Sequence, residues 1–168
     1  MSERPREQSL HCEGKMKKTL LMFVPLVMAI AAVPAGYDHW TAEQLRMREE
    51  VLHKTMKNGL ASETLGHWGN HLLLKTRREA SSGQAELHQK QADLIVVQSG
   101  QATIIIGGKI VNGKTTAANE IRGTSIEGGE RQTLKAGDVV HVPVRTPHQV
   151  LLDAGQTLDY VVLKVDSQ

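Results

Sequence analysis

The sequence is poor in cysteine, in aromatic residues and in net charge, and each shortage excludes a class of protein. Cys12 is the only cysteine in 168 residues, so an intramolecular disulfide cannot form. Two Trp, two Tyr and one Phe are too few to predict a base-stacking surface. The formal net charge of +2 is close to balance, so bulk electrostatics does not favour nucleic acid. We therefore expect no nucleic-acid partner.

Common catalytic motifs are also missing. The chain has no G-x-S-x-G, no cysteine nucleophile and no phosphate-binding glycine loop. The tandem glycines Gly107 and Gly108 lack the strand–turn–helix context that a phosphate loop needs. Acyl transfer through a serine or cysteine and nucleotide binding are therefore not predicted.

One long apolar run is present, and it lies near the N-terminus directly after Lys17 and Lys18. Basic residues, a short apolar run and following alanines are typical of a secretory signal, while a membrane span needs about 20 apolar residues. Met16 precedes the lysines, so we expect residues 1–35 to be an over-extended start plus a signal peptide. The alternative is an anchor that is never cleaved. The pattern predicts a periplasmic or secreted protein, with no stable membrane span after cleavage.

Residues 36–68 are predicted to hold a helix and a linker. Thr41 can cap a helix over 41–57, because Gln44 follows three residues later as in a capping box. An imperfect apolar stripe with charges between supports the same helix. The glycines at Gly59 and Gly66 predict a loop over 58–68.

Residues 69–168 show short apolar runs separated by glycine-containing turns, which predicts an all-β sandwich or barrel. There is no room for crossover helices, so the strands should be mostly antiparallel. Turns are expected at 100–101 and 154–155. The polar stretch 107–130 is long for a connection, and we expect an excursion over one barrel end that rejoins a strand near Arg131.

Two spaced motifs resemble those of the cupins. Gly137, Pro143 and His148 match the second cupin motif, with Arg145 where that motif usually has glycine. The first motif is matched at its two ends: His88 takes the position of the first histidine and Gly100 that of the closing glycine. Between them Lys90 stands where a second histidine is expected, and Asp93 stands near the glutamate position.

The resemblance implies a single-domain cupin, which is a jelly-roll or double-stranded β-helix barrel, here with a short N-terminal α-helix. The stretch 120–143 also resembles a subgroup of small exported bacterial cupins. Barrels of this family often pair through edge strands, so the resemblance further implies a homodimer.

A divalent metal is the first chemistry that these residues indicate. His88, Asp93 and His148 offer two imidazoles and a carboxylate, a three-ligand set that suits Zn, Fe, Mn or Ni. Each residue also has an ordinary interpretation, such as an exposed strand histidine or a turn-capping aspartate. Motif matches alone do not separate the two.

Lys90 opposes the metal interpretation. Lys90 is two residues after His88, so on a strand both would face the barrel interior together with Glu86. An ammonium has no acceptor and cannot ligate a metal while protonated. Lys90 could instead pair with a carboxylate or bind an anionic ligand. Arg145 at the barrel mouth could attract the same anion, although a solvated loop arginine is the simpler interpretation.

Three functions follow as hypotheses. The first is binding of a small, anionic molecule in the barrel, with or without a divalent metal. The second is a metal-dependent enzyme of dioxygenase or isomerase type, in which Glu86 or His141 moves protons. The third is a structural dimer with a vestigial pocket. The ligand cannot be deduced from the fold, since one barrel hosts many activities.

Overall fold

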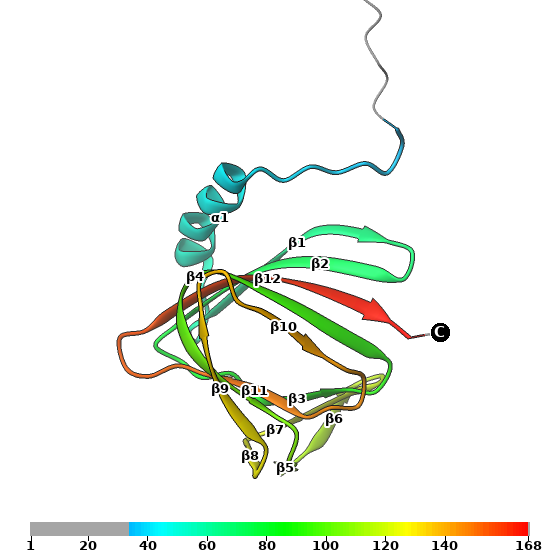
Figure 1. Ribbon diagram of the computed structural model, residues 1–168, viewed down its shortest axis with the longest axis vertical. Coiled ribbons are helices and arrows are strands. Elements are labelled where there is room, and N and C mark those ends of the chain that lie inside the picture. The colour runs from blue at the N-terminus through cyan, green and yellow to red at the C-terminus, as the bar shows by residue number, and fades with distance from the viewer. Residues whose placement is uncertain (1–33, 168) are drawn as a thin grey trace, which may run out of the picture. The chain divides into compact units, whose positions relative to one another are not determined.

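The computed structural model describes residues 34–167, so most of the predicted start and signal segment lies outside the described residues. Within residues 34–167 no helix is long and apolar enough to cross a membrane. A helix is followed by strands that curl into a barrel (Figure 1). The predicted all-β barrel with a short N-terminal helix is confirmed.

Helix α1 spans Ala42–Thr55, close to the predicted bounds. The capping box is formed as predicted: Thr41 Oγ1 accepts from the Gln44 backbone at 3.1 Å, and the Thr41 backbone donates to Gln44 Oε1 at 2.8 Å. Leu52 is buried, whereas Met47 and Val51 remain exposed. Because so little apolar surface of α1 is buried, the contacts that hold it to the sheet are largely polar.

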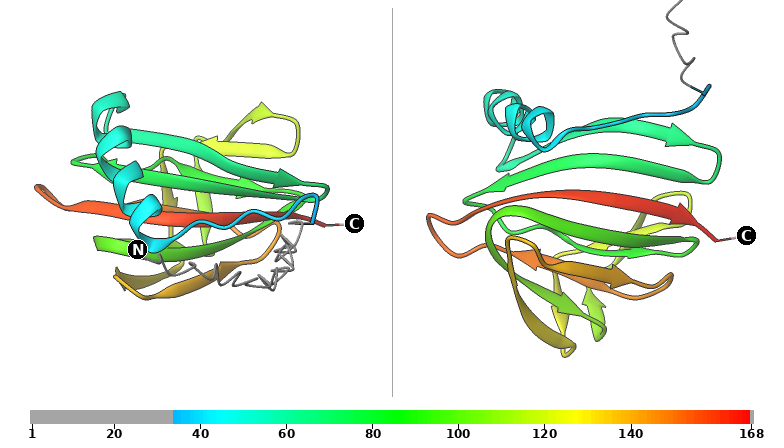
Figure 2. Two further views of the ribbon diagram at one scale, coloured as in Figure 1. Left: turned by 90° about the horizontal axis from the view of Figure 1, so that it is seen from above. Right: turned by 45° about the horizontal axis from the view of Figure 1, so that its top comes forward.

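The strands are antiparallel throughout the pairs described, as predicted. The strands are β1 (Leu60–Trp68), β2 (His71–Glu79), β3 (Ala85–His88), β4 (Gln91–Ile106), β5 (Lys109–Val111), β6 (Lys114–Ala117), β7 (Glu120–Gly123), β8 (Ser125–Glu127), β9 (Glu130–Lys135), β10 (Val139–Val142), β11 (His148–Leu151) and β12 (Thr157–Asp166). The main sheet runs β1-β2-β12-β4-β11-β3-β7-β6, with β9 and β10 also paired to β4. Figure 2 shows how these strands curl around a common interior.

Strand β4 joins the two halves of the barrel. Its first half pairs with β10 and β12, and its second half pairs with β9 and β11. The change occurs at Gly100, whose φ is +83° and where a Cβ would lie 2.0 Å from the Thr157 carbonyl oxygen. The turn predicted at 100–101 is therefore wrong: glycine lets the chain bend without leaving the sheet. The predicted turn at 154–155 is confirmed.

The loop predicted over 58–68 is also wrong, because most of it forms β1. The glycine that suggested a loop lies at a register shift between Thr64 and Gly66. A Cβ on Gly66 would lie 2.1 Å from the Trp68 ring, so this glycine makes room for the indole within the strand. Since β1 pairs with β2, the main sheet begins at Leu60.

The polar stretch 107–130 is more ordered than the excursion we predicted. Strands β5 and β8 form a separate two-stranded sheet, and β6 and β7 extend the main sheet beyond β3. Ile126 of β8 packs with Ala85 and Ile105 in a small second core. The stretch then enters β9 at Glu130, as expected near Arg131.

Candidate functional site

The site begins on β3, where alternate side chains face the barrel interior. Glu86 and His88 point inward, and His88 is 6% exposed. The strand ends at His88, where the Gln89 backbone donates to the Asn119 carbonyl at 2.8 Å. The two inward positions of the first motif are thus taken by Glu86 and His88, two residues earlier than we predicted.

His148 enters the site from β11, which lies beside β3 and pairs His148 with Glu86. The rings of His88 and His148 have centroids 5.2 Å apart. Ligating atoms of Glu86, His88 and His148 all lie within 4.8 Å of one another. The structure thereby brings two distant sequence motifs together, as the resemblance implied.

Both imidazoles are held by their Nδ1 atoms. His88 Nδ1 donates to the Glu120 carboxylate, and His148 Nδ1 donates to the Thr146 carbonyl at 3.2 Å. The Nε2 atoms of both rings therefore face the interior, towards Asp93. Anchoring of one ring nitrogen by a carboxylate or carbonyl is the arrangement found behind metal-ligating histidines.

Asp93 lies at the centre of the charged groups. Its Oδ2 is 3.3 Å from His88 Nε2 and 3.6 Å from His148 Nε2. Lys164 Nζ donates to both carboxylate oxygens, at 2.8 and 2.9 Å. The same Nζ is 3.0 Å from His88 Nε2. Residues 93 and 164 are direct partners in the β4–β12 register, so the sheet itself holds this pair together.

The pKa values follow from these contacts. Burial acts to lower the pKa of His88, but hydrogen bonds to Asp93 and Glu120 outweigh burial and raise the pKa to about 9. Burial acts to raise the pKa of Asp93, but His148, His88 and Lys164 hold the pKa well below its usual value. Asp93 is therefore ionised and His88 charged at neutral pH.

A cavity of about 130 Å³ opens beside this cluster, between the two halves of the barrel. Its apolar lining comes from Leu74, Ile95, Val150 and Val162. Engineered cavities of about 150 Å³ hold a molecule as large as benzene. The cavity is thus sized for a small organic molecule.

Arg78 supplies a buried cation to the cavity wall. The side chain is 9% exposed, donates from Nε to the Tyr160 hydroxyl at 3.2 Å, and lies 3.8 Å from Glu86 Oε1. A Cβ on Gly83 would lie 2.9 Å from the guanidinium, so Gly83 leaves room for it. These contacts use only part of the five-donor guanidinium. Arg122 of β7 also lines the cavity and donates to Glu86 at 3.1 Å.

A divalent metal is the group that the cupin resemblance implies. The donors of Glu86, His88 and His148 fit such an ion, since imidazole nitrogen and carboxylate oxygen are its usual ligands. Asp93, which we predicted as the third ligand, is close to both histidines but is paired with Lys164. Any ion bound at His88 Nε2 would meet the Lys164 ammonium there.

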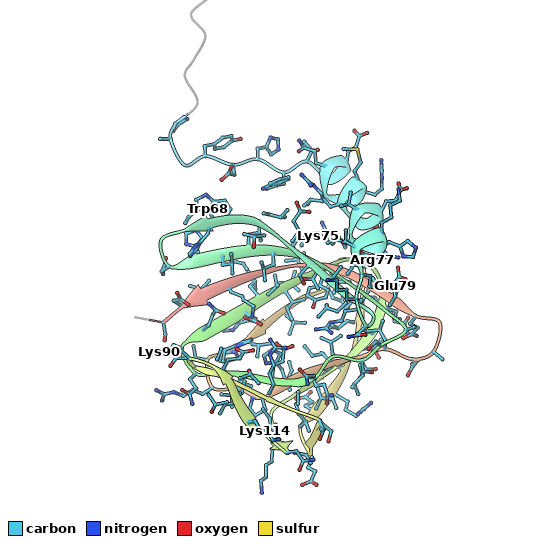
Figure 3. The ribbon with its side chains drawn as sticks, turned by 180° about the vertical axis from the view of Figure 1, so that it is seen from behind. Trp68, Lys75, Arg77, Glu79, Lys90 and Lys114 are labelled. Carbon is cyan, nitrogen blue, oxygen red and sulfur yellow. The ribbon has the colours of Figure 1, made fainter. Side chains whose placement is uncertain are left out.

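Three predicted residues do not lie inside the barrel. Lys90 is exposed beyond the end of β3, and Figure 3 shows it far from Lys75 beneath the helix. Arg145 is exposed in the loop before β11, where its φ of +60° confirms that it accepts the strained glycine conformation. His141 is exposed on β10, so it cannot move protons in the cavity. The expected places of Lys90 and His141 inside the pocket are wrong because both side chains face solvent, whereas Arg145 agrees with the simpler interpretation of a solvated loop arginine.

Lys90 and Arg145 nevertheless lie together on the outer wall. With Leu87 and Ile121 they line a separate groove outside the barrel. The Arg145 backbone donates to the His88 carbonyl at 2.7 Å, which fixes this loop against β3. Their predicted role in ligand binding stays a prediction, and a ligand that they bind would contact this outer groove.

Sequence reasoning missed Lys164, Glu120 and Arg78. Lys164 stands at an alternate position of an apolar strand, in phase with the buried Tyr160 and Val162. A charge on the inward face of a core strand is a signal that could have found it. Glu120 lies in a stretch that we predicted to be loop, so nothing in the sequence pointed to its place.

Similarity to known proteins was found among solved structures and not among sequences. No protein family and no curated protein matches the sequence. TT1209 from Thermus thermophilus matches with 12% identity and a TM-score of 0.52, over 71% of this chain and 94% of its own. KdgF from Halomonas matches with 13% identity and a TM-score of 0.49, over 67% of this chain and 84% of its own. A cupin-superfamily sugar phosphate isomerase from Silicibacter pomeroyi matches with 15% identity and a TM-score of 0.47, over 65% and 60%.

The barrel has the cupin jelly-roll fold. Its curled antiparallel sheet brings the strands of both motifs together around one interior, which is the arrangement of that fold. At such low identities the solved structures show the fold alone. The chemistry must come from the side chains of this chain.

Proposed function

We propose that the barrel binds a small organic anion with a short apolar body. The observation that carries the proposal is Arg78, a buried guanidinium on the cavity wall whose partners use only part of its donors. Its planar fork matches a carboxylate or phosphate group. The apolar residues around it suit a short carbon skeleton.

The charge around the cavity supports the same proposal. Three carboxylates, those of Glu86, Asp93 and Glu120, face three cations, those of Arg78, Arg122 and Lys164. The carboxylates are matched by these cations, and the imidazolium of His88 adds a further positive charge at neutral pH. An anion entering the cavity therefore meets a net positive environment.

Calorimetry with a panel of small carboxylates and phosphate esters tests this function. The protein is first treated with a chelator, so that binding does not depend on metal. We expect Arg78→Met to weaken binding at least about tenfold, the loss of one charged bidentate contact. Arg131→Met is the matched control, because Arg131 is exposed on β9 and outside the cavity lining. Equal weakening by both variants, or no binding in the panel, would overturn the proposal.

A metal-dependent enzyme is the second candidate, favoured by the converging donors of Glu86, His88 and His148. A bound Zn, Fe, Mn or Ni ion would polarise a substrate oxygen or activate water. Glu120 and the Thr146 carbonyl would orient the two imidazoles. Of our two proton-transfer candidates, only Glu86 faces the cavity. Metal analysis of untagged protein tests this candidate: stoichiometric metal that is lost in His88→Ala and His148→Ala supports it.

We also propose export to the periplasm or medium, and a homodimer. Export is supported by the basic and apolar pattern before residue 36. The mature N-terminus, measured by mass spectrometry, tests export, and an intact Met16 on cytosolic protein would contradict it.

Sedimentation tests the proposed homodimer by measuring the oligomeric state. A dimer that binds no ligand and no metal would favour a structural role with a vestigial pocket.

A further inference from the structure

Lys164 holds its ammonium at the point where the site side chains converge. Nζ contacts both oxygens of Asp93, at 2.8 and 2.9 Å, and lies 3.0 Å from His88 Nε2. The side chain is 15% exposed, so water screens these contacts only weakly. The β4–β12 register places residues 93 and 164 directly opposite each other, so the contact is built into the sheet.

Two groups that a metal would use are thereby engaged. An ion bound to His88 Nε2 would have to replace the ammonium at that nitrogen. Asp93, whose Oδ2 is close to both histidine Nε2 atoms, would have to release Lys164 to become a ligand. Among residues 34–167, no hydrogen bond or ion pair joins Lys164 to Glu86 or His148, so the ammonium does not occupy these two donors; Glu86 Oε1 instead accepts from Arg122.

We propose that Lys164 is a tethered cation that stands in the place of a divalent metal in this barrel. It supplies positive charge at the centre of the site and holds Asp93 out of any ligand set. A divalent ion is repelled by the ammonium and finds only the donors of Glu86 and His148 clear of Lys164. Removing the ammonium leaves four donors, because His88 and Asp93 join these two.

The inference rests on the proposed anion-binding function, since it makes that binding independent of metal. Lys164 then adds a third cation to Arg78 and Arg122 beside the cavity. It also goes further, because it predicts a latent metal site that a single substitution opens. The two claims have separate measurements: ligand affinity without metal for the function, and metal affinity without ligand for the inference.

The test is titration of chelator-treated wild type, Lys164→Met and Lys135→Met with Co²⁺ and Zn²⁺. Methionine keeps much of the length and apolar stem of lysine. Lys135 is the matched control, because it is an exposed lysine at the end of β9 and outside the cavity lining. We expect Lys164→Met to bind at least about tenfold more tightly than wild type, since a like charge is removed from the site. Lys135→Met should behave as wild type. The visible absorption spectrum of bound Co²⁺ should differ from that of wild type in Lys164→Met and not in the control, because the Asp93 carboxylate is added to the coordination.

Equal metal affinity in wild type and Lys164→Met would overturn the inference. Tight stoichiometric binding by wild type would do the same. If Lys164→Met does not fold, Lys164→Gln retains a hydrogen-bond donor for Asp93 without the charge and takes its place. Adding Asp93→Asn to Lys164→Met is the last arm: it should remove the gain in affinity, and an undiminished gain would contradict the role of Asp93. Failure of the carboxylate panel with wild type would refute the function alone.

Discussion

Two lysine–aspartate pairs lie on opposite faces of one sheet, one fully buried and one partly exposed, and their surroundings differ. On the inner face, Lys164 of β12 pairs with Asp93 of β4 beside the cavity. On the outer face, Lys75 of β2 lies 3.5 Å from Asp159 of β12, beneath α1 (Figure 3). Residues 159 and 164 are an odd number of positions apart on one strand, which places them on opposite faces.

The outer pair is closed. The side chains of Lys75 and Asp159 are both 0% exposed, and Lys75 Nζ also contacts Gln98 Oε1 at 2.7 Å and Glu49 Oε1 of α1 at 3.4 Å. Arg77 also pairs with Asp159. Burial raises the pKa of Asp159 despite these cations. The cluster joins the helix to the barrel, and none of its residues lines the cavity inside the barrel.

The inner pair is open to exchange. Asp93 has the opposite pKa shift, downward, because His148 and His88 contact it in addition to Lys164. His88 loses its charge only as the pH rises towards its pKa of about 9, whereas lysine and arginine keep their charge to higher pH. The comparison shows that a buried Lys–Asp pair does not define a function. Two imidazole neighbours and an adjoining cavity distinguish the pair that can bind from the pair that holds the fold.

Removing each lysine should give the largest difference between the two pairs. We expect Lys75→Met to lower the free energy of unfolding by about 3–5 kcal/mol, since it breaks a fully buried ion pair. Lys164→Met should cost less, about 1.5–3 kcal/mol, because the imidazoles still contact Asp93. Urea unfolding followed by circular dichroism measures both, with Lys90→Met expected within about 0.5 kcal/mol of wild type. An equal or reversed order would contradict the comparison.

Alkaline pH should weaken the inner cluster and spare the outer one. The folded-state pKa of His88 is about 9 against 6.5 for the free side chain. The stabilisation from this raised pKa is fully present below pH 6.5 and is lost as the pH rises through 9. At about 1.4 kcal/mol per unit, the loss is up to about 3 kcal/mol. Urea unfolding between pH 6 and 9.5 measures it. His88→Asn should flatten the profile, and an unchanged slope in that variant would assign the effect elsewhere.

A smaller effect concerns the carboxylate behind His88. Glu120→Gln removes the charge that contacts His88 Nδ1, so the pKa of His88 should fall by about one unit. NMR titration of the imidazole measures this shift. Glu127→Gln is the matched control, since Glu127 is exposed on β8. If both variants leave the pKa of His88 unchanged, Glu120 does not hold the ring.

The sequence predicted the parts of the site that depend on local patterns. It did not predict the parts that depend on contacts between distant segments. The alternation of Glu86 and His88 on a strand was correct, because side-chain period is a local property. The same alternation gave a wrong inward position for Lys90, because the strand ends at His88. There the Gln89 backbone donates to the carbonyl of Asn119, which belongs to a distant segment. The place of Lys164 beside Asp93 depends on the register of β12 with β4, which no local pattern encodes.

The fold, too, was predicted where local patterns decide it and was missed where contacts between distant segments decide it. The spacing of Gly137, Pro143 and His148 resembled a family motif, and the barrel followed from it. Glycine was ambiguous, because it bends a strand as well as it makes a turn. Gly66 lies inside β1 at a register shift beside Trp68, and Gly100 lies inside β4 where its backbone closely approaches Thr157. The capping box of α1 needed only Thr41 and Gln44, and it was predicted in full.

That capping box gives the smallest prediction, and it tests whether the outer cluster depends on the helix. Thr41→Ala removes the Oγ1 acceptor for the Gln44 backbone and should cost about 1 kcal/mol. Because Glu49 of α1 contacts Lys75, a frayed helix should speed hydrogen exchange at β2 positions beneath it. The pKa of His88, on the inner face, should not move. Thr41→Ser restores the acceptor and serves as the control. A shift at His88 in Thr41→Ala would show that the two faces of the sheet are coupled.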